Sequence, residues 1–248
     1  MSSIIVQKII KGMTLAGALA LFAAGPASAD RPHIWAGPYV GIMAGYAWTH
    51  HEHCDGSSGA FPNCGPFAGV DYPNYDLDGA TIGGTLGYNL QADRLVLGIE
   101  FDYSWADLSG SSPSAGIFSC ATTCASEIDA IATLRGRLGY SFDRLLPYIT
   151  AGVAWTHQKG EIAAGTAVFS SGEAMRMSFV LGAGIEYAFV NNWSLKAEYL
   201  HIFDPSDHTY DNRNSCGTPG CFLRSEDIQW VRIGLNYRFG ERRAEALK

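Results

Sequence analysis

The sequence predicts an all-β protein, an eight-stranded antiparallel transmembrane up-and-down β-barrel. Three observations lead to this fold class. Apolar and polar residues alternate with period two in eight segments, short and long connections between these segments alternate strictly, and the chain holds 29 glycines with 12% aromatic residues. Beyond the N-terminus no uninterrupted apolar run reaches the 18 or more residues typical of a membrane-spanning helix, so strands must carry any membrane crossing.

The first 29 residues have the layout of a cleaved signal peptide. Lys8 and Lys11 precede an apolar run over 13–24, and Ala27-Ser28-Ala29 forms a small-x-small cleavage pattern. An uncleaved anchor is the alternative, but this run is shorter than the about 20 residues that a helical span needs. We therefore expect export and a mature N-terminus at Asp30.

The strand predictions rest on alternation within each segment. In 95–105 the odd positions are apolar or aromatic, while Glu100 and Asp102 lie on the opposite face. In 128–142 the even positions from Ile128 to Phe142 form the apolar face. Each segment is near or above the roughly 9–11 residues of a tilted transmembrane strand. The eight predicted strands are 38–49, 79–90, 95–105, 128–142, 147–158, 175–189, 193–203 and 229–239.

The connections predict the topology. Three are tight, at 91–94, 143–145 and 190–192, and four are long and polar, at about 50–78, 108–126, 159–172 and 204–224. Outer-membrane barrels have short periplasmic turns and longer extracellular loops. We therefore expect four long extracellular loops, with both termini of the barrel chain in the periplasm.

The six cysteines support the assignment of these loops. They occur as three close pairs, each within one long loop: Cys54 and Cys64, Cys120 and Cys124, Cys216 and Cys221. This distribution favours three local disulfides formed in an oxidising compartment, with pairing between neighbouring loops left open. The spacings differ from the Cys-x2-Cys pattern of zinc sites.

Alternation alone does not decide which face of each strand contacts lipid. A secreted lipocalin-like barrel, apolar inside, is the main rival. Aromatic residues gather near the strand ends, as at a membrane interface, and the other face mixes acidic and basic side chains that can pair across a narrow lumen. We therefore expect the apolar face to contact lipid. The expected lumenal charge plug consists of Glu100, Asp102, Arg135, Arg137, Glu186, Lys196, Glu198, Arg232 and Arg238.

Other kinds of chemistry find little support in the sequence. A net charge of −7 without a Lys/Arg cluster disfavours nucleic acid as a partner. No nucleophile motif such as Gly-x-Ser-x-Gly accompanies His157 and His201 near the outer rim, so we expect no enzyme and no cofactor. The histidines His50, His51 and His53 are weak candidates for binding a metal or hemin, because neighbours in a strand or loop need not converge.

Three motifs resemble one family. They are Trp35-x-Gly-x-Tyr39-x-Gly41, Leu195-Lys196-Ala197-Glu198-Tyr199 and Val231-Arg232-x-Gly234-Leu235-Asn236-Tyr237-Arg238-Phe239. The mature chain resembles the alphaproteobacterial small outer-membrane proteins of the RopB and outer-membrane immunogenic protein (porin-like) type. The resemblance implies an eight-stranded barrel over 30–239, inserted by the outer-membrane assembly machinery. It also implies that Tyr237 and Phe239 form the C-terminal insertion signal, although a polar tail, 240–248, follows them here.

These expectations lead to a functional hypothesis. An eight-stranded barrel encloses an interior just wide enough for side chains to fill, which argues against a wide pore. We expect a structural outer-membrane protein of a Gram-negative bacterium that supports envelope integrity and presents disulfide-braced loops. Its expected surroundings are lipid and lipopolysaccharide, and its loops suit contact with host molecules, phage or antibodies. A narrow porin-like channel and a hemin- or metal-binding surface protein remain the alternatives.

Overall fold

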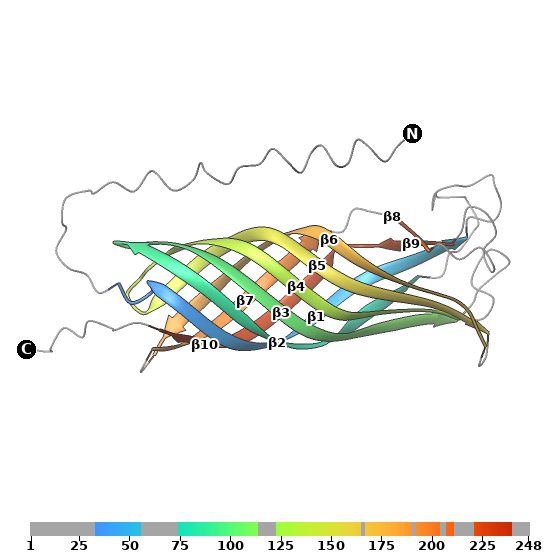
Figure 1. Cartoon of the computed structure of the whole chain (residues 1–248), viewed down its shortest axis with the longest axis horizontal. Coiled ribbons are helices and arrows are strands. Elements are labelled where there is room, and N and C mark those ends of the chain that lie inside the picture. The colour runs from blue at the N-terminus through green and yellow to red at the C-terminus, as the bar shows by residue number, and fades with distance from the viewer. Residues whose placement is uncertain are drawn as a thin grey trace, which may run out of the picture. The chain divides into compact units, whose positions relative to one another are not determined.

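A computed structural model describes residues 33–55, 74–113, 123–164, 167–189, 192–203, 207–210 and 221–239. The expected signal peptide, 1–29, and the polar tail, 240–248, lie outside these residues. Eight long strands form a closed antiparallel barrel, in which β10 pairs back onto β1 (Figure 1). The eight-stranded barrel that the sequence predicts is confirmed. Its strands are β1 (Gly37–Asp55), β2 (Asn74–Ala92), β3 (Leu95–Pro113), β4 (Thr123–Tyr140), β5 (Leu145–Ala164), β6 (Ala167–Ala188), β7 (Trp193–Phe203) and β10 (Ile228–Arg238).

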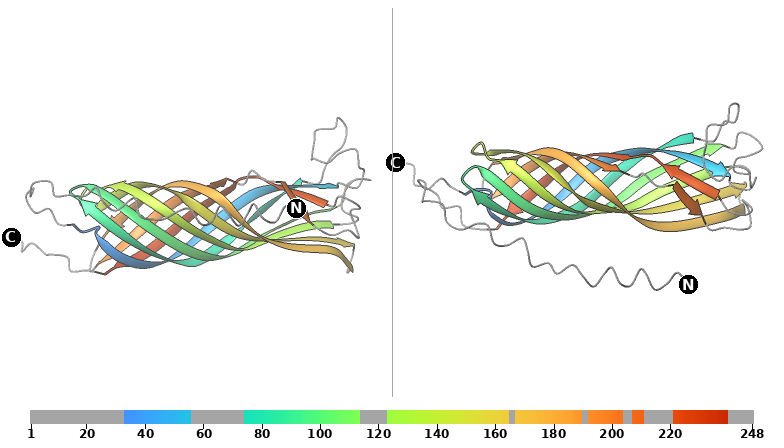
Figure 2. Two further views of the ribbon diagram at one scale, coloured as in Figure 1. Left: turned by 45° about the horizontal axis from the view of Figure 1, so that its top comes forward. Right: turned by 90° about the horizontal axis from the view of Figure 1, so that it is seen from above.

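Tight turns join the strands at one end of the barrel, which we call the turn end. Asp93, Asp143 and Asn192 each have positive φ, at 51°, 54° and 68°, and lie within the three connections predicted to be short. Aspartate and asparagine tolerate this left-handed conformation better than other non-glycine residues. Strand β1 begins and β10 ends at this same end (Figure 2). We call the opposite end the rim end.

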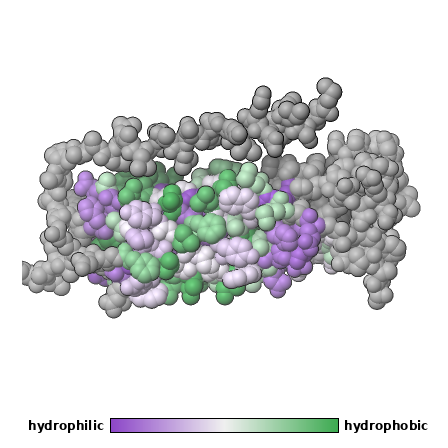
Figure 3. Space-filling view, in the orientation of Figure 1, coloured by the Kyte–Doolittle hydropathy of each residue, from purple (hydrophilic) through white to green (hydrophobic). Residues whose placement is uncertain are grey.

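The apolar band around the barrel has the height of a bilayer core. Strand β7 contains 11 residues, the range predicted for it, and carries Trp193 and Phe203 at its two ends. Eleven residues match a tilted transmembrane strand. Large apolar side chains such as Ile42, Ile99 and Ile149 are exposed on the outer face, and hydrophilic residues bound this band at both ends (Figure 3). Among the described residues, no helix is long and apolar enough to cross a membrane.

Most strands continue far beyond this band at the rim end. Strand β6 has 22 residues and β5 has 20, and they pair as far as Ala164 and Ala167. The prediction of a long loop over 159–172 was therefore wrong, because this segment is mostly a hairpin. The other three long connections are also partly strand. Serine, glycine and charged residues in these segments indicated loops. Antiparallel strands outside the membrane can form without an apolar outer face, because water rather than lipid contacts that face.

Two short strands extend the barrel wall at the rim end. Strand β9 (Cys221–Ser225) pairs with the rim end of β1, beyond the first residue of β10, and β8 (Asp207–Tyr210) pairs with β9 (Figure 1). These extensions correct the placement of the cysteines. Cys54, Cys124 and Cys221 lie in β1, β4 and β9 rather than in loops. The cysteine side chains lie outside the described ones, so the three disulfides remain a prediction.

A β-bulge in β3 and another in β4 reverse the alternation in the rim half of these two strands. The pairing register shifts between Trp105 and Leu108 in β3, and between Ile128 and Ala130 in β4. A bulge inserts one extra residue and so exchanges the two faces beyond it. As a result Ile128, predicted on the outer apolar face, is fully buried inside the barrel beside Leu108.

Candidate functional site

The lumen of the barrel is filled by side chains in three successive layers. At the turn end lies a small apolar cluster, which we call the lower cluster and which consists of Trp35, Val96, Leu146, Tyr148 and Ala188. A layer of paired charges follows. At the rim end lies the upper cluster, which consists of Ala47, Tyr75, Leu77, Leu108, Ile128, Ile131, Ala154, Val180, Leu200, Ile202, Ile228 and Trp230.

The charged layer contains all nine side chains expected in the lumen. None is more than 5% exposed. They come from five strands, β3, β4, β6, β7 and β10, and inward alternation brings their charged groups together. Register places Glu100 opposite Arg135 and Glu198 opposite Arg232 on neighbouring strands, so part of the pairing follows directly from the sheet.

Arg135 is at the centre of this layer. Its guanidinium lies 2.5 Å from Glu100, 2.7 Å from Asp102 and 3.0 Å from Glu198. Its Nε also donates a 2.8 Å hydrogen bond to Oγ1 of Thr133. Since Glu198 comes from β7 and Arg135 from β4, this contact crosses the lumen.

Arg232 contacts one carboxylate across the lumen, Asp102, and one on the neighbouring strand, Glu198. Its Nη1 lies 2.9 Å from Oδ1 of Asp102, and its Nη2 lies 2.5 Å from Oε2 of Glu198. The guanidinium carbon also lies 4.5 Å from the centre of the Trp230 ring, in cation–π geometry. Arg232 thus connects the charged layer to the upper cluster.

Lys196 and Tyr39 complete the environment of Glu100. Nζ of Lys196 donates to both carboxylate oxygens of Glu100 at 2.9 Å. The Tyr39 hydroxyl donates to Oε2 of Glu100 at 2.7 Å and accepts a 3.0 Å hydrogen bond from Arg137. A buried charge is tolerable only when paired and hydrogen-bonded, and Glu100 meets both conditions.

Glu186 gathers the cations nearest the turn end. Arg137 lies 2.8 Å from one of its oxygens and Arg238 lies 3.2 Å from the other. Ser194 donates a further hydrogen bond at 2.6 Å. The Arg137 guanidinium stacks over the Tyr148 ring at 4.1 Å, which connects this group to the lower cluster.

The sequence reasoning missed several residues of the lumen. Tyr39, Thr133 and Tyr148 hydrogen-bond to the network, and the apolar upper cluster was not expected at all. The three polar residues could have been found from strand parity, because Tyr39 shares the inward face of β1 with Met43 and Thr133 shares that of β4 with Arg135. The upper cluster depends on the bulges in β3 and β4, which the sequence pattern does not predict.

The histidine candidates do not converge. His50 lies partly exposed, with its Nδ1 2.8 Å from Oδ1 of Asp76, whereas His51 is fully buried and packs edge-on against Tyr75. Successive residues in a strand point to opposite faces, so the two imidazoles cannot ligate one metal from this backbone. The His53 side chain lies outside those described, and the described residues contain no group of three metal-ligating side chains.

A polar cluster connects β4 to β5 beyond the apolar band. Nδ1 of His157 lies 2.6 Å from Oδ1 of Asp129, and Nζ of Lys159 lies 2.7 Å from Oδ2. Partial burial raises the pKa of Asp129, but hydrogen bonds from Lys159 and His157 outweigh this effect and hold the pKa below its ordinary value. A second pair of this kind joins His201 of β7 to Asp227, just before β10, at 2.8 Å.

The residues of the expected insertion signal lie at the turn end of β10. The Tyr237 ring packs 5.1 Å from that of Trp193 and 5.2 Å from that of Phe239. Phe239 is exposed, and its backbone N–H donates to the Pro38 carbonyl at 2.9 Å. These aromatics belong to the band of rings at this end of the barrel.

Comparison with known proteins agrees with the fold and with the three motifs. Residues 14–239 match the family described as outer membrane protein beta-barrel domain. The chain is 34% identical over 220 residues to the 31 kDa outer-membrane immunogenic protein of Brucella melitensis, covering 83% of this chain and 84% of that protein. It is 28% identical over 187 residues to the 22 kDa outer membrane protein of Rhizobium leguminosarum bv. viciae, covering 74% and 75% of the two chains. The predicted resemblance to this alphaproteobacterial family is confirmed.

Solved structures extend the agreement on the fold. The outer membrane protein OprG from Pseudomonas aeruginosa has a TM-score of 0.51 and 15% identity, over 83% of this chain and 97% of that chain. The outer membrane protease OmpT from Escherichia coli has a TM-score of 0.50 and 9% identity, over 82% and 96%. At these identities the likeness concerns the barrel architecture alone.

Proposed function

This chain belongs to the family of outer membrane protein β-barrel domains and lies in the outer membrane of a Gram-negative bacterium. From that premise we propose that it is a closed structural barrel. It supports envelope integrity, performs no catalysis, and presents its rim end to the exterior.

The filled lumen carries this proposal. Nine charged side chains are paired and buried in the middle, with apolar clusters above and below them. A solute would have to separate several ion pairs in a low-dielectric interior, and each broken pair leaves a buried charge without compensation. This arrangement favours a structural plug over a narrow porin-like channel.

The partners follow from the surfaces. Lipid and lipopolysaccharide contact the apolar band, and the assembly machinery recognises the strand that ends at Tyr237 and Phe239. The extended rim, braced by disulfides among its six cysteines, contacts host molecules, phage or antibodies. Relatives named as immunogenic outer-membrane proteins support such a surface role.

A deletion strain tests this function. We expect the strain to leak periplasmic enzymes and to become sensitive to detergents, while small hydrophilic solutes enter at the wild-type rate. Complementation with the wild-type chain should restore the barrier. Slower solute entry without leakage would contradict the proposal and indicate a diffusion channel.

A further inference from the structure

The charges of the buried lumenal layer do not cancel. The layer contains four carboxylates and five cations, so it carries one net positive charge, and none of its members is more than 5% exposed. The carboxylates belong to Glu100, Asp102, Glu186 and Glu198, and the cations to Arg135, Arg137, Lys196, Arg232 and Arg238. An uncompensated charge in a low-dielectric interior is costly, so a counter-ion for this layer would stabilise the folded barrel.

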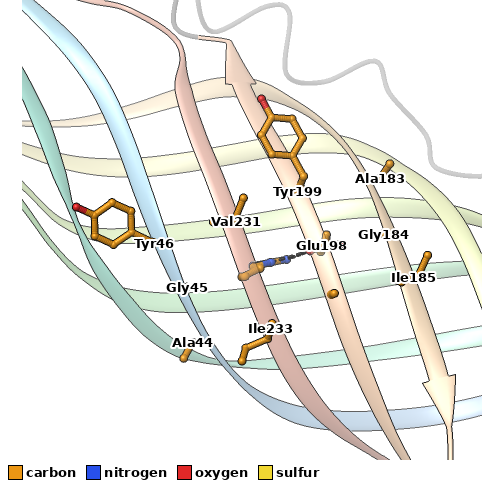
Figure 4. Close-up of a pocket in the computed structure, with 12 residues that line it drawn as sticks. Ala44, Gly45, Tyr46, Ala183, Gly184, Ile185, Glu198, Tyr199, Val231 and Ile233 are labelled. Carbon is orange, nitrogen blue, oxygen red and sulfur yellow. Dashed lines mark hydrogen bonds and ion pairs between the residues drawn. The ribbon is translucent and has the colours of Figure 1, made fainter.

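The excess charge lies toward the turn end. In the middle of the layer three cations meet three carboxylates at 3.0 Å or less, Arg135, Lys196 and Arg232 with Glu100, Asp102 and Glu198. Glu198, for example, points inward from β7 to its ion pair with Arg232 (Figure 4). Nearer the turn end, Arg137 and Arg238 share the single carboxylate of Glu186. Arg137 also approaches Glu100, at 3.6 Å, but Glu100 is already matched by the middle group.

Unpartnered hydrogen-bond donors lie in the same part of the lumen. Within the described part of the chain, Nε of Arg137 and Nε of Arg238 are buried without a hydrogen-bond partner, and so are both amide atoms of Asn89. Arg137 donates through its Nη atoms to Tyr39 and Glu186, and Arg238 donates through its own to Glu186 and to a backbone carbonyl. Buried N–H groups normally have an acceptor. Excess positive charge and unpartnered donors together indicate a site for an anion.

Glycines on both neighbouring strands leave room around the Asn89 amide. Asn89 lies opposite Gly98 of β3 and opposite Gly37 of β1. A Cβ at Gly98 would lie 2.1 Å from Oδ1 of Asn89 and 2.9 Å from Cγ of Arg137, so these two side chains come together over this glycine. A Cβ at Gly37 would have one heavy atom within 4 Å outside its chain neighbours, the Phe239 carbonyl oxygen.

The same glycine provides an approach from the turn end. Gly37 is half-buried and begins β1, whereas the strand residues of the lower cluster come from β3, β5 and β6. An ion can therefore reach Asn89 from the side of β1 and β2 without displacing that cluster. The upper cluster fills the lumen on the far side of the charged layer.

We propose that the lumen binds one small monovalent anion, such as chloride, between Asn89 and Arg137. Nδ2 of Asn89 and Nε of Arg137 donate to the ion, and Arg238 supplies the remaining positive charge. The layer lacks a single negative charge, so a monovalent ion restores neutrality, whereas a multivalent one would reverse the sign. Because the upper cluster closes the lumen, the ion enters and leaves at the turn end and does not cross the membrane.

Urea titration of the refolded full mature barrel in vesicles tests this proposal. At constant ionic strength, replacing gluconate with chloride or bromide should move the wild-type midpoint to higher urea. Each tenfold increase in halide above its dissociation constant should raise the ratio of folded to unfolded protein about tenfold. Arg94→Gln is the matched control, because Arg94 is an exposed arginine of the turn end outside the lumen, and this variant should keep the wild-type halide dependence.

Two variants remove the need for the ion in different ways. Asn89→Asp supplies the missing negative charge inside the lumen, so it should be more stable than the wild type in gluconate and insensitive to halide. Arg238→Gln removes the excess cation and should also be insensitive to halide. Heat-dependent migration in gel electrophoresis verifies that each variant is folded, and Asn89→Asp decides the matter if Arg238→Gln does not fold.

Crystals of the barrel grown in bromide locate the ion. The anomalous map of the wild type should show one peak within hydrogen-bond distance of Nε of Arg137 and the Asn89 amide, and that of Asn89→Asp should show none there. A wild-type stability that does not respond to halide would overturn the proposal, as would a halide dependence that Asn89→Asp retains. A map without a peak in this space would also overturn it and would assign the unpartnered donors to ordered water.

Discussion

At the scale of single residues, Glu198 shows how strongly the lumenal charges depend on one another. It accepts hydrogen bonds from Arg135 at 3.0 Å, from Nε of Arg232 at 2.6 Å and from Tyr148 at 2.9 Å. Losing this one carboxylate leaves two guanidinium groups undercompensated in a buried layer. The cost of such a loss exceeds the net benefit of the intact pair, because the desolvation of the remaining charges is no longer offset.

We therefore predict that Glu198→Gln lowers the free energy of unfolding by about 3 kcal/mol. Urea titration of the refolded barrel in vesicles measures this change. Glu127→Gln, the same substitution at an exposed position of β4, should alter the free energy of unfolding by less than about 0.5 kcal/mol. Equal changes in the free energy of unfolding would contradict the prediction, because the buried carboxylate would then stabilise the barrel no more than an exposed one.

Gly87 is a second residue with a defined steric role. The Tyr39 ring lies over it, and a Cβ at this position would overlap the phenol that hydrogen-bonds to Glu100. We predict that Gly87→Ala destabilises the barrel by about 1–3 kcal/mol through overpacking. Gly84→Ala is the control, since its Cβ would point outward, 3.6 Å from the nearest heavy atom. Thermal unfolding of both variants distinguishes the two positions.

At the scale of elements, the extensions of β4 and β5 are joined by the cluster around Asp129. Because the pKa of Asp129 is depressed in the folded state, its contribution to stability is present above the unfolded pKa, about 3.9, and is lost as the pH falls through the folded value. We predict that Asp129→Asn unfolds more easily than the wild type at pH 6, and that the difference is smaller at pH 3, below the unfolded pKa of about 3.9. Urea titrations at the two pH values measure the difference in the free energy of unfolding between the two proteins. The same difference at both pH values would contradict the link between the protonation of Asp129 and stability.

The hairpin of β5 and β6 is predicted to be dispensable for the barrel itself. The outer apolar band ends near Trp155 and Met177, well before the pairing of Gly160 with Gly172. Replacing residues 160–172 with Asn-Gly should leave a two-residue turn between Lys159 and Glu173. The shortened chain should still insert and migrate as a folded, heat-modifiable band. Failure to insert would mean that the extension contributes to assembly.

At the scale of the whole molecule, the sequence was sufficient for the strand number, the tight turns and the lipid-facing side. Period-two alternation is a local signal, and Trp193–Phe203 shows it without interruption, so its bounds could be predicted to the residue. The strand extensions could not be predicted, because ladders in water have no need of an apolar face. The bulges near Asp107 and Asp129 could not be predicted either, because a bulge changes the pairing between strands without changing their amino-acid composition.

The charged layer of the lumen was also predictable only in part. Parity alone assigned nine charged side chains to the inward face, whereas their partners across the lumen depend on the closure of β10 onto β1. The pairing of Arg135 with Glu198 joins residues 63 positions apart, and no local pattern encodes it. The upper apolar cluster required both the closure and the bulges.

A conductance measurement tests the closed lumen most directly. The full mature barrel, refolded and inserted into planar bilayers, should give no large, stable open channels, with or without reductant, because paired charges between two apolar clusters fill its interior. A wide-pore porin in the same bilayers verifies that the assay detects an open barrel. Large, steady openings of the wild-type protein would contradict the account.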